Sequence, residues 1–301
     1  MDLLRKSLYG LIILLWALPI SAKKAPLAPS PLTAEQEQQF SYYWYAARNA
    51  IDQERYADAY TLLLFCNALK PNDAQTRYYL GIMYQGLGKH EEALQSFEQA
   101  YRATTKGARS EDLLSRLQRV YMANSQWKEA LKIQDELDDL NGYDAYSAIT
   151  RYRIYAMSAQ PQKAIKEIDR YLKTDPNNLQ FLLFKLELME QTNAKPKQLI
   201  AMYKRILAVD PYNLMVLNNY AYFLATHKGD LNEAEQLSAL TIREQPNNPV
   251  FLDTYGWILH LKGQNDLALF YLNRALWNAS EETIKTEVLK HLKEIKPENG
   301  K

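Results

Sequence analysis

The sequence predicts an all-α protein, an α-solenoid of about seven helical hairpins, and two patterns support this fold class. The first is a set of four prolines, Pro71, Pro176, Pro211 and Pro246, at intervals of 105, 35 and 35 residues. Each is followed within two residues by Asn or Asp, so that a helix stop precedes a residue able to cap the next helix. A period of about 34 residues is typical of stacked helical hairpins.

Small residues at regular spacings form the second pattern. Two antiparallel helices approach closely only where side chains are small, while large residues fill the neighbouring spaces. Spacings of 12 and 7 residues recur, with one added residue in the third set. The residues predicted to pack at these helix contacts are Ala47, Ala59 and Cys66; Gly81, Ala93 and Ala100; Ala221, Ala234 and Thr241; and Gly256, Ala268 and Ala275.

The N-terminus has the layout of a secretory signal peptide. Residues 1–22 begin with Arg5 and Lys6, continue in an apolar run and end in small residues. The apolar run is shorter than the roughly 20 residues that span a bilayer. We therefore expect cleavage, export to the periplasm or envelope and no stable membrane insertion afterwards; an uncleaved N-terminal anchor is the alternative. Residues 23–33 contain three prolines and predict an extended tether.

The solenoid is expected to follow this tether directly. Thr33, with Gln36 three residues later, predicts the cap of the first helix. The middle of the chain fits the small-residue pattern less well, because Gln118, Tyr152 and Leu186 stand where Gly or Ala is expected, and we predict looser hairpins there. Within residues 34–282 the seven hairpins are predicted at about 40–73, 74–107, 111–144, 145–178, 179–213, 214–248 and 249–282.

Residues 283–301 are predicted to form a capping helix and a tail. Ile284, Val288, Leu292 and Ile295 recur on one helical face, with Lys and Glu elsewhere. Such a helix shields the last repeat of a solenoid from water.

Composition excludes several function classes. The net charge is +1, and removal of residues 1–22 leaves a neutral chain, so nucleic acid is not expected as a partner. Cys66 is the single cysteine and the four histidines are scattered, so we predict no disulfide, metal site, cofactor or catalytic residue. The carboxylates within 135–139 are expected to form a solvated surface.

The chain resembles the tetratricopeptide-repeat family over about 240 residues. One unit matches the family pattern, and residues 217–264 resemble the C-terminal repeats of exported tetratricopeptide proteins of Bacteroidetes-type envelopes. The resemblance implies a right-handed superhelix whose first helices line a concave groove, and it implies binding instead of catalysis. The matching unit is Leu80-Gly81…Tyr84…Ala93…Phe97…Ala100.

Side chains that project from the first helix of each hairpin are the candidate ligand contacts. They lie at helical spacing on the face turned away from the second helix. The candidates are Trp44, Arg48, Tyr78, Gln85, Arg116, Arg119, Arg153, Asn218, Asn219, Tyr222, Asp253, Trp257 and His260.

Two patches stand out among these candidates. Arg116, Arg119 and Arg153 suggest a basic patch for an acidic peptide, because guanidinium groups bind carboxylates bidentately; ion pairing with local carboxylates is the alternative. The second patch is aromatic and polar. Its amides can bond a peptide backbone and its rings supply contact area, although the rings can instead pack between repeats. This second patch comprises Asn218, Tyr222, Asp253 and Trp257.

The function predicted from these features is non-catalytic. We expect a scaffold or interaction protein of the bacterial envelope that binds a peptide segment or a partner protein in a preformed groove. The alternative is a glycan-binding repeat protein, since the chain contains 22 tyrosines and sugars stack on aromatic faces.

Overall fold

The computed structural model describes residues 31–295, which are helical apart from short connections and contain no strand. The predicted signal peptide, most of the predicted tether and the residues after 295 lie outside the described residues. A short 3-10 turn, η1 (Lys106–Ala108), precedes α6. The helices are α2 (Ala34–Asp52), α3 (Tyr56–Leu69), α4 (Ala74–Gly86), α5 (His90–Ala103), α6 (Glu111–Ala123), α7 (Trp127–Asn141), α8 (Ala145–Met157), α9 (Pro161–Tyr171), α10 (Leu179–Gln191), α11 (Pro196–Val209), α12 (Leu214–Thr226), α13 (Leu231–Glu244), α14 (Pro249–Leu261), α15 (Asn265–Asn278) and α16 (Glu282–Ile295).

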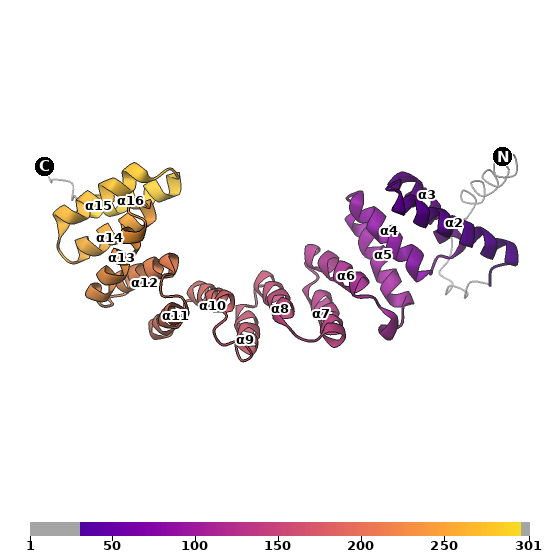
Figure 1. The fold of residues 1–301 in the computed structure, drawn as a ribbon, viewed down its shortest axis with the longest axis horizontal. Helices are drawn as coiled ribbons and strands as arrows, with labels where there is room; N and C mark the ends of the chain where they lie inside the picture. Colours follow the sequence, from indigo (N-terminus) through magenta and orange to yellow (C-terminus); the bar gives the residue numbers. More distant parts are fainter. Residues whose placement is uncertain (1–30, 296–301) are drawn as a thin grey trace, which may run out of the picture. The chain divides into compact units, whose positions relative to one another are not determined.

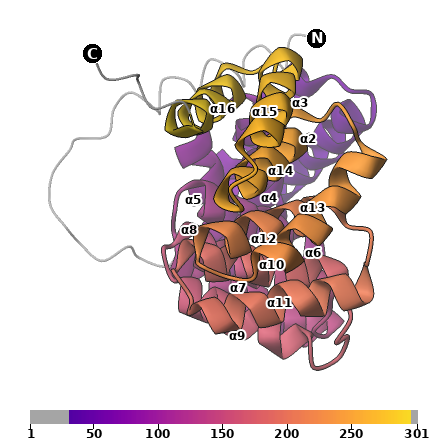
Figure 2. The same cartoon turned by 90° about the vertical axis from the view of Figure 1, so that its left-hand side faces the viewer.

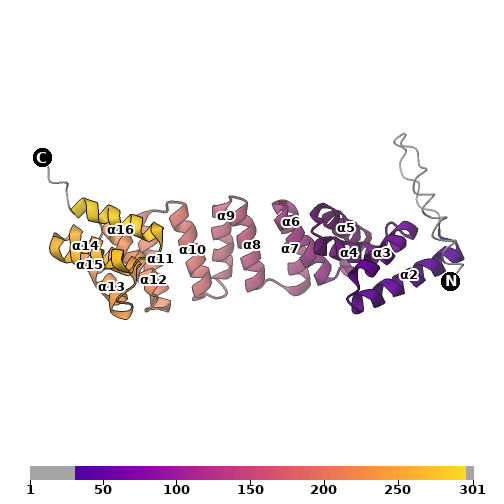
Figure 3. The ribbon, with the colours of Figure 1, turned by 90° about the horizontal axis from the view of Figure 1, so that it is seen from above.

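The helices α2 to α15 form seven hairpins, in which each helix packs on the next along the chain. The chain divides into two compact units at Thr105, so that α2–α5 form one unit and α6–α16 the other. Within the second unit each hairpin also packs on the following one, and α8, α9 and α10 lie side by side in chain order (Figures 1 and 3). This is an α-solenoid of helical hairpins, as the sequence predicts.

The predicted helix starts are observed in detail. Thr33 caps α2, and its side chain and that of Gln36 bond each other's backbone N–H groups at 3.2 and 2.9 Å. Three residues that follow the periodic prolines, Asp73, Asn213 and Asn248, accept hydrogen bonds from the first turns of α4, α12 and α14. The turn residues therefore satisfy backbone donors that no intrahelical carbonyl can reach.

The small residues lie where the helices of a hairpin touch. Every alanine of the predicted set is fully buried, as is Cys66, whose thiol pKa is raised to about 12 by burial and by the nearby Asp73 charge. A Cβ atom on Gly81 would stand 2.6 Å from Phe97, and one on Gly256 would stand 2.8 Å from Leu272. Both glycines thus permit a helix approach that any side chain would prevent.

The middle hairpins replace small residues with specific larger contacts. Gln118 is buried on α6, and its amide donates to Gln134 Oε1 on α7 at 2.8 Å. Tyr152 of α8 stacks on Phe184 of α10, with ring centres 4.6 Å apart. Hairpin contacts here thus depend on an amide pair and on rings that reach the next repeat.

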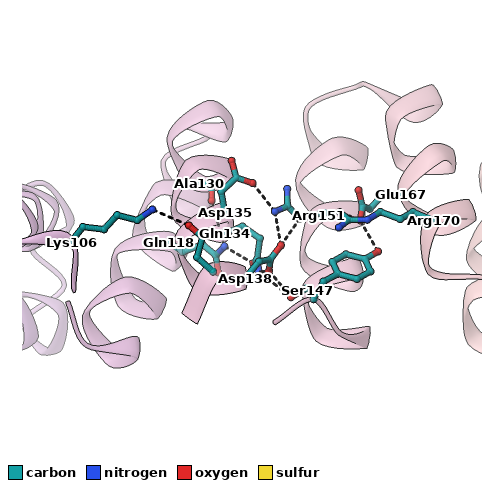
Figure 4. A network of polar contacts seen from close by, with 12 residues as sticks. Lys106, Gln118, Ala130, Gln134, Asp135, Asp138, Ser147, Arg151, Glu167 and Arg170 are labelled. Atoms are coloured by element: carbon teal, nitrogen blue, oxygen red, sulfur yellow. Dashed lines mark hydrogen bonds and ion pairs between the residues drawn. The ribbon is translucent and has the colours of Figure 1, made fainter. Parts of the chain in front are cut away.

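One expectation about this region is wrong, because the carboxylates of 135–139 do not all face solvent. Asp138 is 13% exposed and accepts hydrogen bonds from Ser147 Oγ, Gln134 Nε2 and Arg151 Nη2, each at 2.6 Å (Figure 4). Glu136 is also largely buried and pairs with Arg109 at 2.7 Å. The sequence pattern misses this because Arg151 comes from the next hairpin, which brings the countercharge to Asp138.

The last helix packs on the final hairpin. In Figure 2, α16 lies beside α15. Its residues Val288, Leu292 and Ile295 join the apolar cluster of α14 and α15, with Ile284 half-buried beside them. The capping role expected of this helix is therefore observed. No helix within residues 31–295 has the length and apolar character needed to cross a membrane.

Candidate functional site

The second unit contains an open cavity of about 930 Å³ between α10, α12, α14 and α16. Repeat stacking places the first helices of three successive hairpins along it, and α16 closes one side. A volume near the upper end of the roughly 300–1,000 Å³ of small-ligand sites suits a short stretch of chain. The lining polar and charged residues are Glu190, Asn193, Tyr203, Asn218, Asn219, Tyr222, Thr226, His227, Asp253, Thr254, Thr283, Glu287 and His291.

Asn218 is the most unusual residue of the cavity wall. Its side chain on α12 is 3% exposed, and its Oδ1 atom has no hydrogen-bond partner among residues 31–295. A buried polar atom without a partner costs about 1–3 kcal/mol, so native proteins rarely keep one without a use. Asn218 also lines the cavity, which makes its side-chain amide a candidate ligand contact.

A hydrogen bond and a ring stack, both made by His291, connect α14 with α16. His291 Nδ1 donates to Asp253 Oδ1 at 2.9 Å, and both side chains are largely buried. The same imidazole stacks on the indole of Trp257, with ring centres 4.3 Å apart. Asp253 and Trp257 are thereby held in fixed positions by a helix outside the seven hairpins.

Tyr222 presents the exposed aromatic surface of the cavity. It lies on α12, is 39% exposed and approaches His291 with ring centres 6.4 Å apart. Burial of its hydroxyl raises the pKa of Tyr222, and the charges of Asp253 and Glu287 raise it further against the opposing effect of Lys290. Two carboxylates, Asp253 and Glu287, thus lie close enough to Tyr222 to act on its hydroxyl.

Another part of the cavity wall contains a hydrogen bond between a tyrosine and a carboxylate. Tyr203 on α11 donates its hydroxyl hydrogen to Glu190 at the end of α10. Burial and this hydrogen bond raise the pKa of Tyr203, which keeps the phenol protonated. The ring stacks on Tyr220 at 5.1 Å, so the carboxylate is fixed against a rigid wall.

The structure brings the predicted second patch together. Asn218, Asn219, Tyr222 and Asp253 all line the cavity, while Trp257 lies behind its wall against His291. His260 instead bonds Asn265 in the following turn, at 2.8 Å.

The three arginines of the predicted basic patch lie outside the cavity. Arg116 pairs with Asp112 on its own helix at 3.0 Å, which is the alternative weighed from the sequence. Arg119 and Arg153 are exposed on α6 and α8, and neither forms an ion pair with another described residue. None of the three lines the cavity.

The remaining candidates lie in the first unit, and three of them contact the ring of Tyr79. Trp44 meets Tyr79 edge to face at 5.6 Å, and the Arg48 guanidinium lies 4.9 Å from the centre of the same ring. Tyr78 also contacts Tyr79, at 5.1 Å, and Gln85 is half-buried on α4. The aromatic side chains here form contacts between hairpins.

Sequence reasoning missed the contributions of α16 to the site. Glu287 and His291 occupy a helix for which the sequence pattern predicts a capping role alone, and His227 ends α12 beyond the predicted contact positions. In the sequence, His291 falls on the apolar helical face of Val288 and Ile295, and this polar residue is the signal that could have indicated a buried polar partner. The structure confirms its burial, at 8% exposure.

Comparison with known proteins finds a relative that contains TPR repeats. The chain matches no protein-family model. It is 32% identical over 135 residues to a TPR repeat-containing protein of Pseudomonas aeruginosa, a match that covers 45% of this chain and 22% of that protein. The chain thus spans about a fifth of the length of that relative.

A solved structure supports the fold. The C-terminal part of a TPR repeat-containing protein from Cytophaga hutchinsonii superposes with a TM-score of 0.58 at 12% identity, over 82% of this chain and 98% of that one. At this identity the likeness shows the fold alone. It agrees with the α-solenoid of helical hairpins that the sequence predicts.

Proposed function

We propose that this chain, which resembles TPR repeat-containing proteins, is a non-catalytic interaction protein of the bacterial envelope that binds a peptide segment of a partner protein. The site is the cavity between α10, α12, α14 and α16. The observation that carries the proposal is the unpartnered amide oxygen of the buried Asn218 in the wall of an open cavity. Extended peptides present free backbone N–H groups to such acceptors.

The rigidity of the cavity supports binding without rearrangement. The imidazole of His291 fixes Asp253 and Trp257, and the phenol of Tyr203 fixes Glu190. Side chains that are already ordered lose little conformational entropy when a ligand arrives.

Photo-crosslinking in intact cells tests this function. A photoreactive phenylalanine analogue in place of Tyr222 should crosslink to one segment of an identified envelope protein. The same analogue in place of Trp277, which is 89% exposed outside the cavity, is the matched control. Identical sets of products from both positions, mapped by mass spectrometry, would contradict the proposal.

Export is the second part of the proposal. It rests on the basic start, apolar run and small-residue end of residues 1–22. Purified cellular protein should have a mature N-terminus near Lys23 and should be released with the periplasmic fraction. An intact N-terminal Met1 in protein that remains with the membranes would favour the anchored alternative.

Glycan binding stays the competing function. A sugar stacks on a free aromatic face, whereas Trp257 is stacked on His291 and Tyr222 offers one partly exposed ring. Oligosaccharides that shift the tryptophan fluorescence of the wild type, while no protein crosslinks from position 222, would support the glycan alternative.

A further inference from the structure

We propose that the cavity between α10, α12, α14 and α16 selects a positively charged, lysine- or arginine-containing peptide segment. This inference deepens the proposed function and rests on it. The basic side chain lies between Tyr222, Asp253 and Glu287, and a backbone N–H of the same segment donates to Asn218 Oδ1.

The charge of the wall favours a cation. Carboxylates enter it from three helices, with Glu190 from α10, Asp253 from α14 and Glu287 from α16. No lysine or arginine is among the described residues that line the cavity. Complementary charge of this kind sets the partner class and accelerates association.

The partners of these carboxylates do not cancel the excess negative charge of the cavity wall. Glu190 receives a neutral phenol, and Asp253 receives the imidazole of His291. Glu287 pairs with Lys290 at 2.6 Å, but both side chains are more than half exposed. An exposed pair is screened by water and exchanges readily, so an incoming cation can compete for Glu287. The pKa of Tyr222 is raised mainly by burial of its hydroxyl, and the charges of Asp253 and Glu287 add to this effect.

The shape of the wall favours a lysine or arginine on a peptide over a small free amine. Tyr222 and Val250 are each more than one-third exposed, and they offer apolar surface along which an aliphatic stem can lie. A cationic head group over the Tyr222 ring gains a cation–π contact. Asn218 lines the same cavity, so one extended segment can contact both the charged wall and this amide side chain.

Asn218 gives the sharpest test, because ligand binding and stability should change in opposite directions. Asn218→Leu removes the unpartnered buried oxygen, and we expect the melting temperature to rise or stay unchanged while peptide affinity falls roughly tenfold or more. Ser238→Ala is the matched control, since Ser238 Oγ is also buried without a partner but does not line the cavity. It should leave peptide affinity unchanged.

The probe is a short acetylated alanine–serine peptide amide that carries two lysines and a fluorophore. Otherwise identical peptides carry two norleucines or two glutamates. We expect the lysine peptide to bind the full mature chain at least about tenfold more tightly than either of the others in fluorescence anisotropy, with affinity that weakens as salt rises.

Reversing the charge of one wall residue tests whether the preference for the lysine peptide arises in the cavity. Glu287→Lys should reduce affinity for the lysine peptide roughly tenfold. Glu244→Lys makes the same charge change at an exposed position of the second unit outside the cavity, and should leave affinity nearly unchanged.

Three results would overturn the inference: equal or tighter binding of the glutamate peptide, no binding of any peptide, or the same affinity in Glu287→Lys as in the wild type. If they occur while crosslinking from position 222 still identifies a partner segment, the cavity binds another peptide class and the proposed function stands. If crosslinking also fails, both proposals are wrong.

Discussion

At Gly81 the absence of a single carbon atom sets the distance between two helices. A Cβ atom there would lie 2.6, 2.7 and 2.9 Å from three atoms of the Phe97 ring, and Phe97 is itself fully buried. The ring cannot retreat without displacing other core residues, since protein interiors are close-packed.

We predict that Gly81→Ala lowers stability by about 1–3 kcal/mol through overpacking. Gly86→Ala is the control. Gly86 ends the same helix, and a Cβ atom added there would meet no atom within 4 Å, so the change should be neutral or stabilising by up to about 1 kcal/mol. Urea unfolding followed by circular dichroism measures both. Equal stability of the two variants would mean that the small-residue register is wrong at this hairpin.

At the scale of the element, a polar seam joins α7 to α8. Asp138 accepts from Ser147, Gln134 and Arg151, and Arg151 also reaches Asp135 at 2.6 Å (Figure 4). Burial alone would raise the pKa of Asp138, but the hydrogen bonds and the Arg151 charge outweigh it, and the pKa is lowered.

The lowered pKa predicts how stability depends on pH. An unfolded aspartate titrates near pH 3.9, and the folded Asp138 titrates below that value. The stabilisation is therefore fully present above the unfolded pKa and is lost as pH falls through the folded pKa. Asp138→Asn should cost about 2 kcal/mol at neutral pH, and the difference from wild type should shrink only as the solution becomes strongly acidic.

Denaturant midpoints of both proteins across this pH range provide the measurement. Asp139→Asn serves as the control, because Asp139 is two-thirds exposed and pairs only with the exposed Lys106. A pH-independent difference between wild type and Asp138→Asn would contradict the assignment of the seam to ionised Asp138.

The helix α16 acts as a cap and as a wall of the cavity. Val288 is fully buried against the final hairpin, whereas its neighbour Leu289 is 43% exposed. We predict that Val288→Asp detaches α16, because an unpaired charge cannot be buried cheaply. Binding of a hydrophobic dye should increase and the Trp257–His291 stack should be lost.

Leu289→Asp introduces the same charge on the same helix and should change neither property. Tryptophan fluorescence and dye binding distinguish the two variants. An unaltered spectrum in Val288→Asp would show that the cavity does not depend on the docking of α16.

For the whole molecule, the division into two units means that a substitution can lower the stability of one unit without changing ligand binding in the other. In a repeat array each hairpin interacts energetically with its neighbours, so damage in one part propagates weakly. Gly81 belongs to the unit of α2–α5, whereas every residue that lines the cavity belongs to the unit of α6–α16.

We therefore predict that Gly81→Ala leaves lysine-peptide affinity within about twofold of wild type at a temperature where both proteins are folded. Fluorescence anisotropy gives this affinity directly. A loss of affinity comparable to that of Asn218→Leu would indicate that the first unit takes part in binding.

The repeat architecture could be predicted from sequence because its signals are local. Helix caps such as Asp73 act within one turn, and the contact of Gly81 with Phe97 joins residues only 16 positions apart in adjacent helices. Asn218, Tyr222 and Asp253 were identified for the same reason, since the repeat period places equivalent positions of neighbouring hairpins on one side.

The helical hairpins, their order and the small residues at the contacts of the first two and last two hairpins follow from the amino-acid pattern alone, because that pattern recurs at the repeat period. The contacts that side chains make between elements are visible only in the tertiary structure. His291 crosses from α16 to Asp253 and Trp257, Arg151 neutralises Asp138 from the next hairpin, and Asn218 is buried without a partner. Such pairings depend on non-periodic contacts between elements, which a repeat pattern does not encode.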